Sequence, residues 1–152
     1  MKNKKIKWLM VIAWMILIFT FSSQPGDTSE ETSQFVIYIF NLLGLDLHGY
    51  FGALADFAVR KGAHFTEYLI LYMLFYNALS ESLNFKKALW FSMVAVFLYA
   101  CSDEFHQSFV PGRGPAFRDV LIDSSGGFSG LIIIFIVTLK KRSDRKKKEL
   151  IK

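Results

Sequence analysis

Four long apolar runs, at residues 8–21, 64–79, 88–101 and 120–139, constrain this chain more than any other feature of its sequence. The interior of a bilayer offers the backbone no hydrogen-bond partner, so a crossing segment must be helical over about 20 mostly apolar residues. The first run is slightly short by this measure. Hydrophobic residues make up 53% of the chain, which is unusual for a soluble domain of this size. The sequence predicts an all-α membrane bundle of four transmembrane helices, in one domain over residues 1–152.

The first apolar run has a second interpretation. It follows the basic start MKNKKIK, which is also the order found in a secretory signal peptide. The residues after it, Ser22 to Pro25, contain no small-residue cleavage pattern of the A-x-A kind. A retained membrane anchor is therefore the favoured interpretation.

The connection between the first two runs contains two shorter apolar segments. Residues 35–45 have about half the spanning length and follow the polar run GDTSEETSQ, which predicts a helix lying in the membrane interface. Residues 49–60 are expected to form a further short helix that leads into the second span.

The distribution of basic residues predicts the orientation, because Lys and Arg accumulate in short cytoplasmic loops and ends. Of 18 basic residues, four precede the first run, two lie between the second and third, and eight follow the fourth. These place both termini and the basic tail 140–152 in the cytoplasm and residues 22–61 and 102–118 on the outer side of the membrane. Basic residues that flank apolar runs do not form a nucleic-acid surface, so nucleic acid is not an expected partner despite the net charge of +5.

The four remaining basic residues lie on the outer side and need a local reason, such as pairing with acids or binding an anion. Arg60 opens the segment RKGAHFTEY, in which Arg60, His64 and Glu67 share one helical face and Lys61 and Tyr68 flank it. Ionisable groups at this depth usually face a bundle interior or a water-filled pocket. The alternative is an ion pair that only fixes helix packing.

The third span continues into SDEFHQSFVPGRGPAFRD. If the helix extends through its first residues, Asp103 and His106 face inward as a pair and Glu104 points elsewhere. The prolines and glycines then predict a turn-rich loop that carries Arg113, whose guanidinium suits a phosphate or carboxylate. A lipid-headgroup anchor is the plainer role for Arg113.

The fourth span opens with Arg118 and Asp119. Asp123, one turn further on, needs a partner in an otherwise apolar helix. Gly126 and Gly130 lie on the same side and are expected to let another helix approach closely.

Segments distant in sequence thus bring acids, imidazoles and fixed cations to the predicted outer face. The candidates for acid/base catalysis are His64, Glu67, Asp103, Glu104, His106, Asp119 and Asp123. The candidates for substrate binding are Arg60, Lys61, Tyr68, Gln107, Arg113 and Arg118. Three functions remain open: an enzyme acting on a lipid-linked or anionic envelope substrate, a non-catalytic binder or carrier, and a structural protein whose polar cluster packs helices.

Metal binding is a narrower alternative. His64 with Glu67, and Asp103 with His106, each place two ligand types one turn apart. No zinc-hydrolase spacing such as H-E-x-x-H is present, so paired ions and hydrogen bonds are favoured and no metal is predicted. Cys101 is the single cysteine and excludes an intrachain disulfide. The sequence gives no indication of a cofactor.

Two long motifs, RKGAHFTEYLIL and SDEFHQSFVPGRGPAFRDVLIDSSGGFSG, resemble those of the VanZ-like family of bacterial membrane proteins, and SSQP after the first run fits as well. The resemblance covers most of the chain and rests on several motifs in the same order. It implies a small multispan protein of the cell membrane, with membrane lipids as partners. The family's founding member is associated with resistance to the glycopeptide antibiotic teicoplanin.

The family motifs correspond by position to a set of residues that overlaps the candidates above. They are Lys61, His64, Glu67, Tyr68, Asp103, Glu104, Gln107, Phe109, Arg113, Asp119, Gly126 and Gly130. Asp123 stands where Asn is frequent in relatives, which weakens any mechanism that requires a negative charge at that position.

Overall fold

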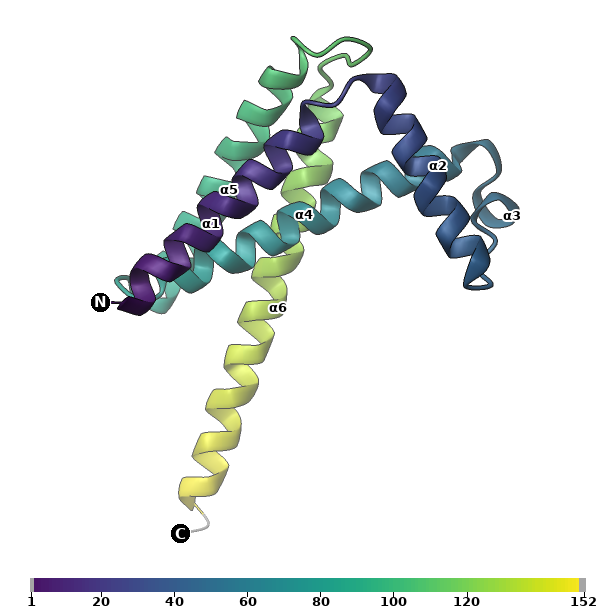
Figure 1. Ribbon diagram of the computed structural model, residues 1–152. Coiled ribbons are helices and arrows are strands. Elements are labelled where there is room, and N and C mark those ends of the chain that lie inside the picture. Colours follow the sequence, from purple (N-terminus) through teal and green to yellow (C-terminus); the bar gives the residue numbers. More distant parts are fainter. Residues whose placement is uncertain (1, 151–152) are drawn as a thin grey trace.

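The computed structural model describes residues 2–150, and every regular element in this range is helical, as predicted (Figure 1). The five long helices are α1 (Lys2–Ser22), α2 (Gly26–Leu42), α4 (Ala55–Leu79), α5 (Phe85–Gln107) and α6 (Phe117–Leu150). A short helix, α3 (Leu47–Phe51), and a 3-10 turn, η1 (Gly52–Leu54), connect α2 to α4. In Figure 1, α1, α4, α5 and α6 form a bundle, while α2 and α3 project to one side beside the start of α4.

Helix α4 lies at the centre of the bundle. Its Tyr68, Leu71 and Tyr72 side chains are fully buried among apolar residues of α1 and α5. Two hydrogen bonds tie α1 to its neighbours: the Trp14 indole N–H donates to the Glu67 carbonyl oxygen at 3.0 Å, and the Tyr99 hydroxyl donates to that of Met15 at 2.6 Å. These partly buried donors position α1 against α4 and α5.

Small residues on α6 allow it to pack closely against α4, and these two helices form the most extensive contact in the bundle. A Cβ atom added at Gly126 would overlap the Phe65 carbonyl oxygen of α4. One added at Gly130 would lie 2.9 Å from Cδ1 of Tyr72. The prediction that these two glycines are helix-packing residues is confirmed.

Three helices are long and apolar enough to cross a membrane: α1 over Lys4–Ser22, α5 over Phe85–Gln107 and α6 over Phe117–Glu149. A fourth crossing is present if α2 and the stretch Leu47–Leu79, which are bent by 113° where they join, count as one broken span. Large apolar side chains such as Trp90 and Phe128 are exposed on the outer faces of α5 and α6. The chain is therefore an all-helical membrane protein with three to four candidate spans.

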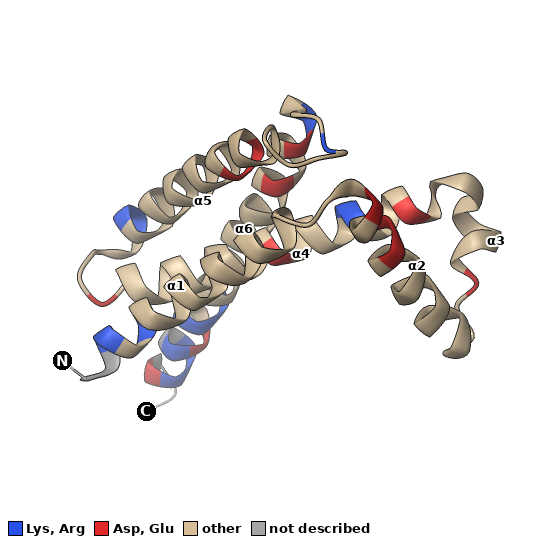
Figure 2. Ribbon diagram, turned by 45° about the horizontal axis from the view of Figure 1, so that its top comes forward, with Lys and Arg blue, Asp and Glu red and all other residues tan. Residues whose placement is uncertain are grey.

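The two ends of the bundle differ in charge. Lys7 of α1 bonds to Glu81 in the turn between α4 and α5, so the N-terminal basic segment and this turn lie at one end. The same contact holds the pKa of the Glu81 carboxyl below its usual range. Figure 2 shows Lys and Arg positions gathered at the end that carries both termini, and acidic positions toward the opposite end of α5. A common side for the two termini agrees with the predicted topology, and the assignment of that side to the cytoplasm remains a prediction.

Helix boundaries differ from the predicted ones around the second span. The predicted extent of the short helix at 49–60 is wrong. Helix α3 ends at Phe51 because Gly52 has φ 54°, and α4 begins at Ala55. Helix α4 then continues without interruption through the segment RKGAHFTEY. The helix expected at 35–45 begins earlier, at Gly26, and includes the polar run GDTSEETSQ. It ends before Gly44, which has φ 84°.

Candidate functional site

The candidate site lies where α1 meets α2, at the end of α5 and the beginning of α6. The loop from Ser108 to Ala116 folds back over this end, and its Pro111 carbonyl oxygen accepts a hydrogen bond from the Gly26 backbone N–H at 3.1 Å. Gly112 has φ 73°, so this turn needs a residue without a Cβ atom, and Gly26 packs directly against it. The loop thereby closes the space above the polar face of α4.

Three buried carboxyl groups line the interior of this site. The side chains of Asp103, Glu104 and Asp123 belong to residues only 3%, 6% and 2% exposed. One Asp103 carboxylate oxygen, Oδ2, accepts hydrogen bonds from the Ser22 hydroxyl at 2.7 Å and the Gln107 amide at 3.1 Å. Asp123 approaches His64 instead, with 3.6 Å between Oδ1 and Nδ1. A buried carboxylate without a hydrogen-bond or ion partner destabilises the fold, so the partners of these groups contribute to stability.

The structure corrects two expectations for the end of α5. Glu104 does not point away from the site, because the returning loop covers that side of the helix and the Ala116 backbone N–H donates to its Oε1. His106 does not face inward with Asp103. Its Nε2 lies 3.1 Å from the Ser23 hydroxyl and its ring packs against Phe19 at a centroid distance of 4.4 Å, so it contacts α1 at the rim.

Asp119 pairs with two of the cations, Lys61 and Arg118. Lys61 donates to Asp119 at 2.6 Å, and Arg118 Nε lies 3.9 Å from the other oxygen of the same carboxylate. The Arg118 side chain is largely exposed and its guanidinium lies 5.0 Å from the centre of the Phe57 ring. These residues form the outer wall of the site.

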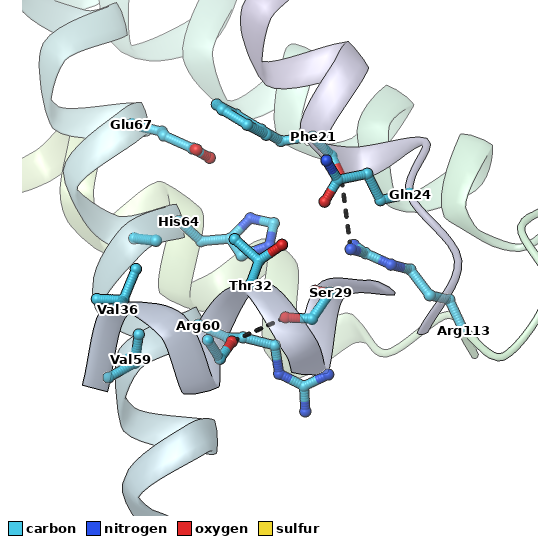
Figure 3. A pocket seen from close by; sticks show the side chains of 12 residues that line it. Phe21, Gln24, Ser29, Thr32, Val36, Val59, Arg60, His64, Glu67 and Arg113 are labelled. Carbon is cyan, nitrogen blue, oxygen red and sulfur yellow. Dashed lines mark hydrogen bonds between the residues drawn. The ribbon is translucent and has the colours of Figure 1, made fainter. Parts of the chain in front are cut away.

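Arg60, His64 and Glu67 line one cavity of about 180 Å³, as their predicted common face requires (Figure 3). Arg113 lies across this cavity from α4, where its guanidinium donates to the Phe21 carbonyl oxygen at 3.4 Å and to the Gln107 side-chain oxygen at 3.2 Å. Hydroxyl groups of α2 complete the lining: Ser29, Thr32 and Ser33. We call this space the arginine cavity.

Two further hollows adjoin the arginine cavity. An apolar groove of about 710 Å³ shares Phe21, Val36, Val59, Ala63 and Glu67 with it and continues along α1, α2 and α4. A polar hollow of about 260 Å³ lies on the other side and shares Arg60, His64 and Arg113. It also contains Lys61, Gln107, Arg118 and Asp119. The three spaces form a continuous amphipathic surface.

Electrostatics distinguish the two arginines of the cavity from the other cations of the site. Among the residues that the structure describes, neither Arg60 nor Arg113 has a carboxylate oxygen within 4.0 Å. Burial lowers the pKa of the Arg113 guanidinium, the neighbouring charge of Arg60 acts in the same direction, and nearby carboxylates oppose both. A guanidinium stays protonated despite such shifts. The cavity therefore presents two fixed positive charges that lack direct ion partners within the described chain.

Sequence reasoning missed the contribution of the segment between α1 and α2. Ser22 is fully buried against Asp103, Ser23 contacts His106, and Gln24 lines the arginine cavity. The available signal was the polar SSQP immediately after an apolar run. Tyr68 is fully buried in the core, and Gln107 bonds to both Asp103 and Arg113.

Replacing Ser22 by Ala should lower the free energy of unfolding by about 1–3 kcal/mol, because a buried carboxylate loses a hydroxyl donor. Thermal unfolding in detergent measures the effect. The matched control is Ser108→Ala, since Ser108 is exposed and bonds only to the Phe105 carbonyl oxygen. Equal stability of the two variants would show that the Ser22–Asp103 hydrogen bond contributes nothing measurable.

Comparison with known proteins gives a family but no individual relative. No curated protein and no solved structure matches the chain. A family model described as VanZ/LLP1 matches residues 7–138, a range that includes every residue described for the site. The chain therefore belongs to the VanZ/LLP1 family.

Proposed function

We propose that this protein binds an anionic lipid, or a lipid-linked envelope precursor, at the outer face of the bacterial cell membrane. Arg60 and Arg113 hold the anionic headgroup in the arginine cavity and the apolar groove receives the hydrocarbon chain. The observation that carries the proposal is the direct continuity of a doubly cationic cavity with an apolar groove. Binding of this kind would let the protein lower teicoplanin susceptibility, since glycopeptides act on precursors outside the membrane.

The charge of the cavity supports an anionic headgroup. Two guanidinium groups without direct carboxylate partners repel one another, and an anion that both can contact removes that repulsion. Guanidinium groups also match phosphate oxygens through parallel N–H donors. The Ser29 and Thr32 side chains beside them add hydroxyl groups suited to phosphate oxygens.

The shape of the groove supports a lipid over a free anion. Its lining includes Trp14, Leu17, Val36, Phe40, Val59 and Ile70. An apolar ligand placed there would gain about 25 cal/mol for each Å² of apolar surface removed from water. A water-soluble phosphate would occupy the cavity and leave the groove without a role.

Glu67 favours a second candidate function, which is acid/base chemistry on the bound headgroup. Its carboxyl group lines both the arginine cavity and the apolar groove, at the place where headgroup and chain would join. A proton-transfer group must lie within hydrogen-bond reach of the reacting atom, and a headgroup bound in the arginine cavity would lie beside Glu67. Under this alternative, Glu67→Gln keeps lipid binding and loses turnover.

Binding is tested by native mass spectrometry of the purified protein with phosphatidylglycerol, undecaprenyl phosphate or phosphatidylcholine as the probe. The wild type should retain the two anionic lipids at least tenfold better than the zwitterionic one. The double variant Arg60→Ala/Arg113→Ala should lose this preference, because the cavity then holds no guanidinium. Lys86→Ala removes an exposed cation at the other end of the bundle and should behave like the wild type.

The comparison among probes also separates the ligand classes. Preference for undecaprenyl phosphate over phosphatidylglycerol would favour a lipid-linked envelope precursor, whereas equal retention would favour a general anionic lipid. Binding of phosphatidylcholine as tightly as the anionic lipids would overturn the proposal.

A further inference from the structure

Three side chains from three different helices bring unpaired polar atoms close together next to the arginine cavity, which His64 also lines. Nδ1 of His64 on α4, Oδ1 of Asp103 on α5 and Oδ1 of Asp123 on α6 are buried and have no hydrogen-bond partner among the described residues. Ligand atoms of these three residues lie within 4.8 Å of one another. Unpaired buried acceptors are uncommon in folded proteins, and three that converge call for a specific explanation.

We propose that His64, Asp103 and Asp123 bind a divalent transition-metal ion of the Zn²⁺ or Mn²⁺ class. These are not the pairs suggested by helical spacing, which joined His64 with Glu67 and Asp103 with His106. The sequence could not bring α4, α5 and α6 to one point. The proposal does not depend on lipid binding, although His64 also lines the arginine cavity and the ion would lie beside the headgroup.

The spacing of the donors suits a metal better than a hydrogen bond. The 3.6 Å between His64 Nδ1 and Asp123 Oδ1 is too long for a hydrogen bond. Two ligands that each lie about 2.1 Å from a tetrahedral metal ion are about 3.4 Å apart. Small side-chain rotations would bring the three donor atoms to bonding distance of one ion.

Charge also favours a dication at this position. Asp103 and Asp123 belong to residues 3% and 2% exposed, and no described Lys or Arg nitrogen lies within 4.0 Å of either carboxylate. Lys61, the closest candidate in sequence to His64, is paired with Asp119. A divalent ion balances two carboxylates beside a neutral imidazole, whereas the unpaired charges would be costly to bury.

The surroundings orient the donors as they do in known metal sites. Ser22 and Gln107 both bond to Oδ2 of Asp103, which leaves Oδ1 directed into the cluster. Outer partners of this kind commonly fix carboxylate ligands. The Tyr68 hydroxyl, fully buried one turn after His64, lies beside the Asp103 carboxylate without a hydrogen bond of regular geometry and can supply a further oxygen. A mixed imidazole and carboxylate set matches Zn²⁺ or Mn²⁺ chemistry.

Metal content of the full-length protein, purified in detergent without a histidine tag, tests the inference. The protein is stripped with EDTA, incubated with Zn²⁺ or Mn²⁺ alone, desalted and analysed by inductively coupled plasma mass spectrometry. The wild type should retain about one equivalent of at least one ion, and Asp123→Asn and His64→Ala should retain less than a tenth of that. The matched controls Asp27→Asn and His48→Ala alter exposed residues and should retain the wild-type amount.

A spectroscopic measurement on the wild type keeps the test decisive where a variant does not fold. Electron spin echo envelope modulation of bound Mn²⁺, or of Cu²⁺ added in its place, should reveal an imidazole nitrogen ligand. Absence of binding by the wild type would overturn the inference and leave protons as the counter-charge of the two carboxylates. Full metal retention in Asp123→Asn and His64→Ala, or a bound ion without a nitrogen ligand, would overturn it equally.

Discussion

Arg113→Glu should abolish protection against teicoplanin in a susceptible Gram-positive host that gains protection from the wild-type protein. The substitution turns attraction for the headgroup into repulsion. At 4 Å and an effective dielectric constant of 20, one charge contact is about 4 kcal/mol, so reversal should weaken anion binding by more than a hundredfold. The measurement is the teicoplanin inhibitory concentration, with membrane levels matched by immunoblot.

The control for this experiment carries the same charge change elsewhere. Lys86 is exposed in the first turn of α5, whereas the arginine cavity lies toward the other end of that helix, so Lys86→Glu should leave protection unchanged. Arg113→Lys should give partial protection, because an ammonium keeps the charge and loses the planar pair of donors. Protection by Arg113→Glu at the wild-type level would remove this residue from the function. If the wild-type protein gives no protection, teicoplanin resistance is not a consequence of its function. Lipid binding is then judged by native mass spectrometry alone.

Gly126→Val should have the largest effect on folding. A Cβ atom at this position overlaps the Phe65 carbonyl oxygen, which belongs to the backbone of α4 and cannot rotate away. Helices α4 and α6 must then separate, and overpacking of this kind costs about 1–3 kcal/mol or more. Because Asp123 lies one turn before Gly126, the separation should also disturb the site. The amount of monodisperse protein after detergent extraction and its thermal midpoint measure the effect.

Gly62→Val is the matched control for Gly126→Val. Gly62 lies in α4, and a Cβ atom there meets nothing within 4 Å. Helix propensity changes little between the two replacements, so their difference isolates the contact between helices. Equal yield and equal thermal midpoints would show that α4 and α6 do not pack as described.

The polar face of α4 was accessible to sequence reasoning because it depends on helical periodicity alone. Arg60, His64 and Glu67 occupy nearly the same side of any α-helix, and the structure places them along one cavity. The packing role of Gly126 and Gly130 followed from their spacing in the same way. These properties are local, so neighbouring helices do not alter them.

Residues at the end of α5 show where that reasoning stopped. Helical spacing correctly predicted that Asp103 faces inward, and it predicted that Glu104 points elsewhere. The loop from Ser108 to Ala116 covers that side of the helix, so Glu104 is also buried in the site. His106 contacts α1 because α1 passes the rim at Ser23. The path of a loop and the neighbour of a helix face depend on packing between distant segments. The periodicity of a single helix carries no information about that packing.

The sequence by itself determined that this chain is helical, that it has the composition of a membrane protein and that its ionisable residues gather near particular helix ends. The physical reason is that a bilayer requires apolar helices and leaves charges only where partners or water are available. Only the tertiary structure decided which of these charges meet. It paired Lys61 with Asp119 and placed Arg60 and Arg113 in a cavity beside an apolar groove. It also brought ligand atoms of His64, Asp103 and Asp123 within 4.8 Å of one another. Those contacts join residues of different helices, and their distances follow from how α4, α5 and α6 pack.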